Sequence, residues 1–263
     1  MDLQTIKRIG IRAAYRAGRI LIDHFDKPLQ VKKKGAIDLV TQADVASEKV
    51  IVATIKEVFP DHAILAEESG AAEGNKHDRW IIDPLDGTTN FAHHLPIFAV
   101  SIAYTRDDAP LMGIVFNPAS GELFTAIHEQ GARLNDTSIN VSTTEQVGDS
   151  LLVTGFPYTI HTASPAEPIS RFTRCLTASQ GVRRLGSAAL DLCFVACGRF
   201  EGFWEDNLKP WDTAAGMLIV REAGGKVTDY KDRPYRVEDN QILATNARIH
   251  GEMVQLLNLE DCA

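Results

Sequence analysis

One stretch of the chain, residues 80–91 (WIIDPLDGTTNF), constrains the fold more than any other. It opens with the apolar run Trp-Ile-Ile, which is typical of a buried strand. It then changes to two acids around a proline, Asp83 and Asp86, followed by Gly-Thr-Thr-Asn. No Lys or Arg occurs between Trp80 and Arg106, so the two carboxylates have no local positive partner. Burying such groups without a cation is costly. The stretch therefore predicts a strand that presents acids at the rim of a sheet, with Mg²⁺ as the candidate cation.

Two further acids occupy comparable positions. Glu67 directly follows the apolar segment 63–66, which reads as a short buried strand. Asp212 lies in the first turn of a predicted helix over 210–223, where its negative charge would also favour the helix dipole. Together with Asp83 and Asp86 they could hold two Mg²⁺ ions, the usual clamp for in-line displacement at phosphorus. The backbone N–H groups of the turn after Asp86 would then face phosphate oxygens.

The composition is that of an ordinary globular protein. The chain has 263 residues, 44% hydrophobic and 24% charged, enough for one large domain or two small ones. A formal net charge of −8 argues against direct nucleic-acid binding as the main function. The four cysteines show no CxxC spacing and are expected to be packed thiols. We see no signal peptide and no run near the ~18 apolar residues of a membrane span, which predicts a soluble, cytoplasmic protein with no membrane contact.

The pattern of elements changes along the chain. Helical periodicity covers residues 3–26 and a stretch from 41 to about 60, and the segments 97–104, 111–116 and 122–127 read as an antiparallel meander. From about residue 150 strands alternate with helices. This is an α+β pattern rather than a doubly wound sheet. We predict two subdomains, 1–145 with most of the acids and 146–263 completing the site.

Two polar positions near the start have alternative interpretations. Residues 31–38 contain three consecutive lysines, Lys32, Lys33 and Lys34, which form either a solvated charged loop or a basic lip that attracts an anionic substrate. Asp44 falls in the first turn of a helix, where it is either a capping residue or part of the site.

These segments resemble the signatures of the inositol monophosphatase family, in its bacterial inositol-1-monophosphatase branch. The resemblance rests on residues 67–69 (EES), 80–91 and 211–216 (WDTAAG), and extends to 38–41 and 186–189, so that it covers essentially the whole chain. It implies a layered αβαβα sandwich of the inositol monophosphatase and fructose-1,6-bisphosphatase superfamily. It also implies a homodimer, two to three Mg²⁺ per active site, inhibition by Li⁺, and hydrolysis of a small phosphorylated polyol such as myo-inositol monophosphate.

The resemblance also assigns roles. One metal would be bound by Glu67, Asp83 and the backbone carbonyl of Leu85, a second by Asp83, Asp86 and Asp212, and a third, weaker one near Glu67. Thr88, paired with Asp44, would activate the attacking water, so that the catalytic set is Thr88, Asp44 and Glu67. The expected substrate contacts are Asp86, Gly87, Thr88, Ala188, Glu205 and Lys33, with Lys32 and Lys34 as alternatives to Lys33. His93 and His94 receive no role, and Asp191 stays open between a substrate contact and an interface.

Other functions use the same residues. Fructose-1,6-bisphosphatase, 3′-phosphoadenosine phosphatase and histidinol-phosphatase share the metal core, and Arg183 or Arg184 could bind a second anion. An alternative of another class is a regulatory binding module, because some bacterial relatives contact the transcription machinery. The complete set of acids favours retained catalysis.

Overall fold

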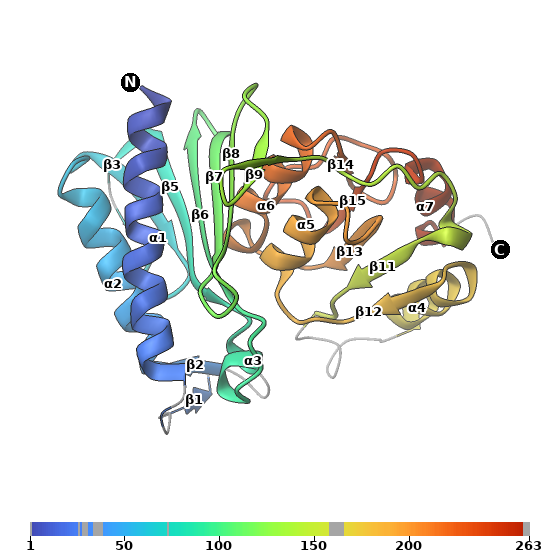
Figure 1. Cartoon of the computed structure of the whole chain (residues 1–263), viewed down its shortest axis with the longest axis horizontal. Coiled ribbons are helices and arrows are strands. Elements are labelled where there is room, and N and C mark those ends of the chain that lie inside the picture. The colour runs from blue at the N-terminus through green and yellow to red at the C-terminus, as the bar shows by residue number, and fades with distance from the viewer. Residues whose placement is uncertain are drawn as a thin grey trace.

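The computed structural model describes residues 2–25, 27, 31–33, 39–72, 74–157 and 166–259, with backbone only for 31–33, 39–41 and 76. Figure 1 shows five layers: two helices, a large sheet, two helices, a smaller sheet and two helices. This is the αβαβα sandwich expected for the family, so the predicted α+β fold class is confirmed. The outer layers are α1 (Leu3–Phe25) with α2 (Gln42–Lys56), and α4 (Ala166–Ala178) with α7 (His250–Leu257); the middle layer is α5 (Ala188–Ala196) with α6 (Pro210–Glu222).

The larger sheet has the strand order β10-β9-β8-β7-β6-β5-β3-β4. Only the β3–β5 pair is parallel, and the rest form the predicted antiparallel meander. Its strands are β3 (His62–Ala66), β4 (Gly70–Ala72), β5 (Asn75–Asp86), β6 (Ala99–Arg106), β7 (Ala109–Asn117), β8 (Glu122–Ile127), β9 (Ala132–Leu134) and β10 (Thr137–Ile139). Sequence patterns missed β4, β9 and β10, because three-residue strands are too short to show a period.

The smaller sheet has the order β12-β11-β13-β15-β14 and is mixed. β11 pairs in parallel with β12 and β13, whereas β15 is antiparallel to both of its neighbours. Its strands are β11 (Leu151–Thr154), β12 (Gly181–Arg183), β13 (Gly202–Asp206), β14 (Lys226–Thr228) and β15 (Gln241–Thr245). Outside the layers lie the strand pair β1 (Val31–Lys33) and β2 (Leu39–Thr41), the short helix α3 (Thr88–Ala92) and the 3₁₀ turn η1 (Val147–Asp149).

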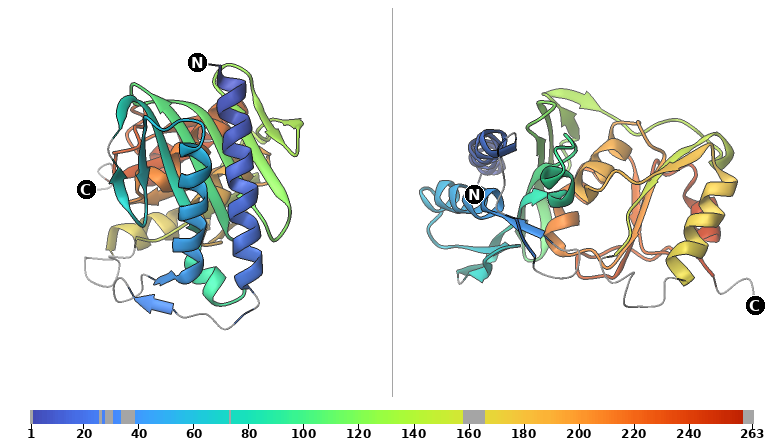
Figure 2. Two further views of the ribbon diagram at one scale, coloured as in Figure 1. Left: turned by 90° about the vertical axis from the view of Figure 1, so that its left-hand side faces the viewer. Right: turned by 90° about the horizontal axis from the view of Figure 1, so that it is seen from below.

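β5 is buried on both faces of the larger sheet. Trp80 and Ile82 pack in the core beneath α1 and α2, and Ile81 packs in the core around α5 and α6. Side chains alternate between the two faces of a strand, so a strand covered on both sides needs apolar residues at every position. The run Trp-Ile-Ile is therefore continuous because helices cover this part of the strand on both faces. Figure 2 shows α1 and α2 lying side by side over one face of the sheet.

The middle layer approaches the larger sheet at a point without side chains. A Cβ atom on Gly113 of β7 would lie only 2.6 Å from the carbonyl oxygen of Ala215 in α6. The helix backbone therefore rests directly on the strand backbone. This close approach fixes the height of α6, and with it Asp212 in the first turn, above the sheet.

The predicted division at residue 145 stays a prediction. Strands of the larger sheet come from residues 62–139 and those of the smaller sheet from 151–245. The two sheets share the middle helical layer, since α5 and α6 contact strands of both. Among the described residues, no helix has the length and apolar character needed to cross a bilayer.

Candidate active site

A cavity of about 310 Å³ opens where both halves of the chain meet. Nearly all of the predicted site residues line it: Glu67, Asp83, Leu85, Asp86, Gly87, Thr88, Ala188, Glu205 and Asp212. They come from the end of β5, the segment after β3, the first turns of α5 and α6, and β13. The structure therefore brings together groups that lie up to 145 positions apart in the sequence (Glu67 to Asp212).

The end of β5 is irregular, and this irregularity turns its acids toward the cavity. The pairing with β6 shifts register between Asp83 and Asp86. Oδ1 of Asp83 accepts the backbone N–H of Leu85 at 2.9 Å, which closes a tight local turn around Pro84. The strand then ends at Gly87, whose φ of 92° is in the left-handed region that glycine adopts most easily. Sequence patterns placed the end of the strand at Ile82, because two acids and a proline are unusual inside one.

Thr88 begins α3 and is 9% exposed. Its Oγ lies 3.2 Å from Oδ1 of Asp44 and 3.0 Å from the carbonyl oxygen of Leu85. Asp44 itself is fully buried in the first turn of α2 and does not line the cavity. A threonine hydroxyl can donate one hydrogen bond and accept others. Its single proton goes to Asp44 or to the Leu85 carbonyl, and in either case the hydroxyl oxygen can accept a hydrogen bond from a ligand in the cavity.

Asp86 joins the two halves of the chain. Its Oδ2 accepts a hydrogen bond from the hydroxyl of Ser187 at 2.6 Å and from the backbone N–H of Ala189 at 2.8 Å. Burial raises the pKa of Asp86 to about 6, although these donors and the N–H groups of Ala188 and Gly87 oppose the rise. Ser187 belongs to the segment 186–189 that carries the family resemblance, and it is the cap of α5. Its hydroxyl also accepts the N–H of Leu190, so the cap and the carboxylate contact are one structure.

Asp212 approaches from the opposite side of the cavity. Its Oδ2 accepts the backbone N–H of Lys209 at 2.7 Å, which caps α6. Burial and the neighbouring charge of Asp86 raise the pKa of Asp212 to about 8. Burial and repulsion from Glu67, Asp86 and Asp212 likewise raise the pKa of Asp83 well above its ordinary value. The four acids are therefore close enough to repel one another in a buried place.

The donor set fits a hard divalent cation. Four carboxylates and one backbone carbonyl are all-oxygen ligands, which Mg²⁺ prefers. In this structure, within the described part of the chain, no three His, Cys, Asp or Glu side chains converge tightly enough to form a ready-made metal site. The raised pKa values of Asp83, Asp86 and Asp212 show what the present arrangement costs, since each acid resists ionising beside the others. A cation would remove that cost and draw the oxygens together.

A second group of polar residues lines the wall on the side of α5 and β13. Glu205 of β13 is 9% exposed, and its carboxylate fills the space in which a Cβ of Gly155 would lie. Asp191 of α5 is 1% exposed, and its Oδ1 has no hydrogen-bond partner among the described residues. Arg184 also lines this wall, whereas its neighbour Arg183 does not. Asp191 therefore faces the cavity, and its role as a substrate contact or at an interface stays a prediction.

The remaining sequence-based assignments have mixed outcomes. The side chains of Lys32, Lys33 and Lys34 lie outside the described residues. His93 and His94, which received no role, are not among the residues that line the cavity. Several lining residues had no sequence signal of function, because a loop position gains its role only from the fold: Phe156, Pro157, Asn207, Leu208 and Lys209.

Comparison with known proteins supports the same reading. An inositol-1-monophosphatase from Synechocystis sp. is 49% identical over 259 residues, covering 97% of this chain and 90% of the relative. The protein named Nus factor SuhB in Escherichia coli is 42% identical over 262 residues, covering 98% and 97%. The crystal structure of the extragenic suppressor protein suhB from Bartonella henselae has a TM-score of 0.94 at 40% identity, covering 97% of this chain and 99% of that one.

A second solved structure agrees with these relatives. An inositol monophosphatase from Anabaena (Nostoc) sp. has a TM-score of 0.89 at 43% identity, covering 98% of this chain and 96% of that one. The model of the inositol monophosphatase family matches residues 2–260. The acids around the cavity, the five-layered fold and this match together place the chain in the inositol monophosphatase family.

Proposed function

We propose that this protein is a Mg²⁺-dependent phosphatase that hydrolyses the monophosphate of a small polyol, with myo-inositol monophosphate as the leading substrate. The observation that carries the proposal is the convergence of Glu67, Asp83, Asp86 and Asp212 on one cavity beside Thr88. Family membership supports a phosphatase. The substrate and the metal are our inference.

The acids divide into two overlapping sets of metal ligands. Glu67, Asp83 and the carbonyl of Leu85 would hold one ion, and Asp83, Asp86 and Asp212 a second; a third, weaker ion would bind near Glu67. When bound, Mg²⁺ supplies Lewis-acid stabilisation of the phosphate charge and activation of the water nucleophile. Asp83 would serve both ions, because the charges of Glu67, Asp86 and Asp212 all act on its carboxyl group and raise its pKa.

The other residues of the turn act on the water and the phosphate. The hydroxyl of Thr88 would orient the attacking water by accepting its hydrogen bond, and Asp44 would take the hydrogen bond that Thr88 donates. Glu67 would assist the water from the far side. The backbone N–H groups of Gly87 and Thr88 would hold phosphate oxygens. Ala188, Asp86 and Glu205 would contact the leaving alcohol, with Lys33 as the expected residue of the basic lip.

The test is phosphate release from the purified full-length chain. We expect turnover of inositol 1-phosphate that requires added Mg²⁺ and stops with chelator. Side-by-side values of kcat/KM on inositol 1-phosphate, fructose 1,6-bisphosphate, phosphoadenosine phosphate and histidinol phosphate rank the candidate substrates. Asp149→Asn is a suitable control, because Asp149 is exposed and lies outside the cavity. Turnover that is absent, or that does not depend on metal, would refute the proposal.

A second candidate function is a regulatory contact with the transcription machinery. It is favoured by the relatives named Nus factor SuhB, such as the one from Escherichia coli at 42% identity. A homodimer in the cytoplasm is part of the same expectation. Co-purification with RNA polymerase, together with a dimer that responds to Mg²⁺, would support this role. Failure to co-purify under gentle conditions would count against it.

A further inference from the structure

We propose that Arg184 and Asp191 determine which leaving group the cavity accepts: Arg184 donates hydrogen bonds to the hydroxyl oxygens of a neutral polyol, and Asp191 with Glu205 disfavours a second phosphate. This inference rests on the proposed phosphatase function and concerns the wall on the side of α5 and β13. Arg184 and Asp191 line the cavity but are not among the proposed metal ligands, so the metal site does not account for their presence there.

Arg184 is a cation directed at the cavity without a partner of its own. It is exposed and lines the cavity. A Cβ on Gly186 would lie 3.0 Å from its Nη1 and 3.1 Å from Nδ2 of Asn90, so the guanidinium lies beside the Gly186 backbone. The Asn90 amide donates to the carbonyl of Leu185 at 2.8 Å, which anchors the segment next to Arg184. Within the described residues, Arg184 makes no ion pair or hydrogen bond. Its five N–H donors are thus available to a ligand.

Asp191 and Glu205, on the same wall of the cavity as Arg184, also have unfilled hydrogen-bonding capacity among the described residues. Asp191 is 1% exposed and lines the cavity. Its Oδ1 has no hydrogen-bond partner among the described residues. Such an oxygen costs free energy until it meets a hydrogen-bond donor. The carboxylate of Glu205 likewise has no hydrogen bond in the described structure. Both acids sense the charge of Arg184, which opposes the rise in their pKa caused by burial.

This combination of charges favours hydroxyl groups over a second anion. A sugar or cyclitol hydroxyl accepts a hydrogen bond through its oxygen and donates one through its hydrogen. It can therefore satisfy a guanidinium and a carboxyl group at the same time. A second phosphate at Arg184 would lie beside two buried acids, which repel it in proportion to their ionisation. Among the described residues that line the cavity, the only other Lys or Arg is Lys209. It is the N-cap of α6, three residues before Asp212.

The test compares two adjacent arginines, of which only Arg184 lines the cavity. Arg184→Ala removes a cavity residue, and Arg183→Ala removes an exposed residue that does not line the cavity. Wild type, both variants and Asp191→Asn are assayed with Mg²⁺ on inositol 1-phosphate, on fructose 1,6-bisphosphate and on p-nitrophenyl phosphate, which has no hydroxyls. Circular dichroism and thermal melts establish that each variant is folded.

For Arg184→Ala we expect the ratio of kcat/KM on inositol 1-phosphate to that on p-nitrophenyl phosphate to fall about 10-fold, mainly through KM. The same ratio for Arg183→Ala should stay within about 2-fold of wild type. Asp191→Asn should raise kcat/KM on the bisphosphate relative to the monophosphate, most strongly at alkaline pH, where Asp191 would be ionised and the amide carries no charge. Equal effects of the two arginine variants would overturn the inference.

Two other results have distinct meanings. If Arg184→Ala loses activity on the bisphosphate more than on the monophosphate, Arg184 binds a second anion and the proposal is wrong. If wild type releases no phosphate from any of the three substrates, the phosphatase function itself fails. Active wild type with unchanged ratios in all variants would reject the selectivity role and leave the phosphatase function standing.

Discussion

Oγ of Thr88 lies 3.2 Å from Oδ1 of Asp44, a carboxylate that is fully buried behind the cavity wall. The two residues are 44 positions apart, on α3 and α2. Because Asp44 does not line the cavity, its hydrogen bond with Thr88 is its route to a substrate. When Thr88 donates to Asp44 rather than to the Leu85 carbonyl, 3.0 Å away, its oxygen accepts from the cavity.

The hydroxyl, rather than the size of the side chain, should determine activity at position 88. We expect Thr88→Ala to lower kcat by about 10²- to 10⁴-fold, the usual contribution of a group that handles the proton of the nucleophile. Thr88→Ser keeps the hydroxyl and should retain most of the activity. Steady-state phosphate release measures both variants. Equal losses in the two would show that the methyl group, and therefore packing, was responsible.

Asp212→Asn should separate stability from turnover. The amide oxygen can still accept the N–H of Lys209, so the cap of α6 survives. Removing one of several mutually repelling acids should leave the melting temperature without metal unchanged or higher. Turnover should nearly disappear, and the rise in melting temperature on adding Mg²⁺ should shrink, because a ligand stabilises a fold in proportion to its affinity. A variant with wild-type phosphate release would exclude Asp212 as a ligand.

His250 should make the protein lose stability in mild acid. Burial lowers its pKa from 6.5 to about 4. The hydroxyl of Thr228 donates to the carbonyl of Asp229, so its oxygen accepts the Nε2 proton of His250 at 2.9 Å. Nδ1 then carries no proton and accepts from the hydroxyl of Thr245 at 2.8 Å. The neutral ring therefore satisfies this pocket, and a second ring proton would displace a hydrogen bond.

The stability of the folded protein should fall with falling pH because His250 takes up a proton on unfolding. Between pH 6.5 and about 4 the unfolded chain binds a proton at His250 that the folded chain does not, so stability falls as the pH falls through this window. The loss should reach about 2 kcal/mol at pH 5. Urea unfolding of wild type and His250→Gln at pH 7 and pH 5 measures it. The variant should show a smaller difference between the two pH values; burial also lowers the pKa of His62, which leaves a residual slope. An identical slope in both proteins would contradict the assignment.

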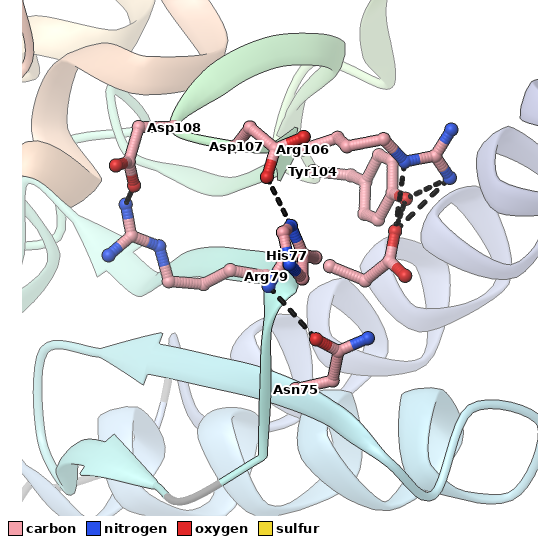
Figure 3. Close-up of polar contacts among 8 residues, drawn as sticks. Asn75, His77, Arg79, Tyr104, Arg106, Asp107 and Asp108 are labelled. Atoms are coloured by element: carbon pink, nitrogen blue, oxygen red, sulfur yellow. Dashed lines mark hydrogen bonds and ion pairs between the residues drawn. The ribbon is translucent and has the colours of Figure 1, made fainter.

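The far end of β5 should affect stability without affecting catalysis. There Asp78 accepts hydrogen bonds from the hydroxyl of Tyr104 and, at 3.1 Å, from Nε and Nη2 of Arg106. Figure 3 labels these two donor residues. Asp78 is eight positions before Asp86 on the same strand, roughly 25 Å away. Asp78→Ala would leave two partly buried donors unpaired and should cost about 1–3 kcal/mol of unfolding free energy.

A matched control lies in the same view of the molecule. Asp107 pairs with His77 at the exposed β6–β7 turn (Figure 3), where an ion pair contributes little. Asp107→Asn keeps a residue that tolerates the positive φ of this position and should therefore change the unfolding free energy by less than about 1 kcal/mol. Both variants should keep wild-type kcat. A loss of kcat in Asp78→Ala, measured well below its melting temperature, would show that the two ends of β5 are coupled.

Much of the fold could be predicted because its signals are local. α6 begins at Pro210, where the helix over 210–223 was predicted to start, and β8 has the predicted bounds, Glu122–Ile127. Pro110 misled the prediction of the β6–β7 turn. The chain reverses at Asp107 and Asp108, which both have positive φ, and Pro110 is already part of β7. A proline marks a turn only where its missing N–H is not tolerated by the strand.

Site residues could be predicted where the residue type and its neighbours in the sequence indicate the chemistry. They could not be predicted where their role depends on contacts that only the fold creates. Acids at the ends of apolar runs identified Glu67, Asp83 and Asp86 as candidates. The bond from Ser187 to Asp86, across 101 positions, has no sequence signal because only the packing of α5 against β5 creates it. The same holds for Arg184 and Arg183, which are chemically identical and are distinguished only by which one lines the cavity.

The contact between Gly113 and Ala215 has a consequence for anyone who searches for active-site residues by random mutagenesis. Gly113 does not line the cavity, yet a single added methyl group there would push α6 away from β7, and Asp212 would move with the helix. Such a variant would be recovered as a folded but inactive enzyme with weakened metal binding. Screens that score only lost turnover would thus assign it to the catalytic machinery, although its contribution is to set the spacing between two layers.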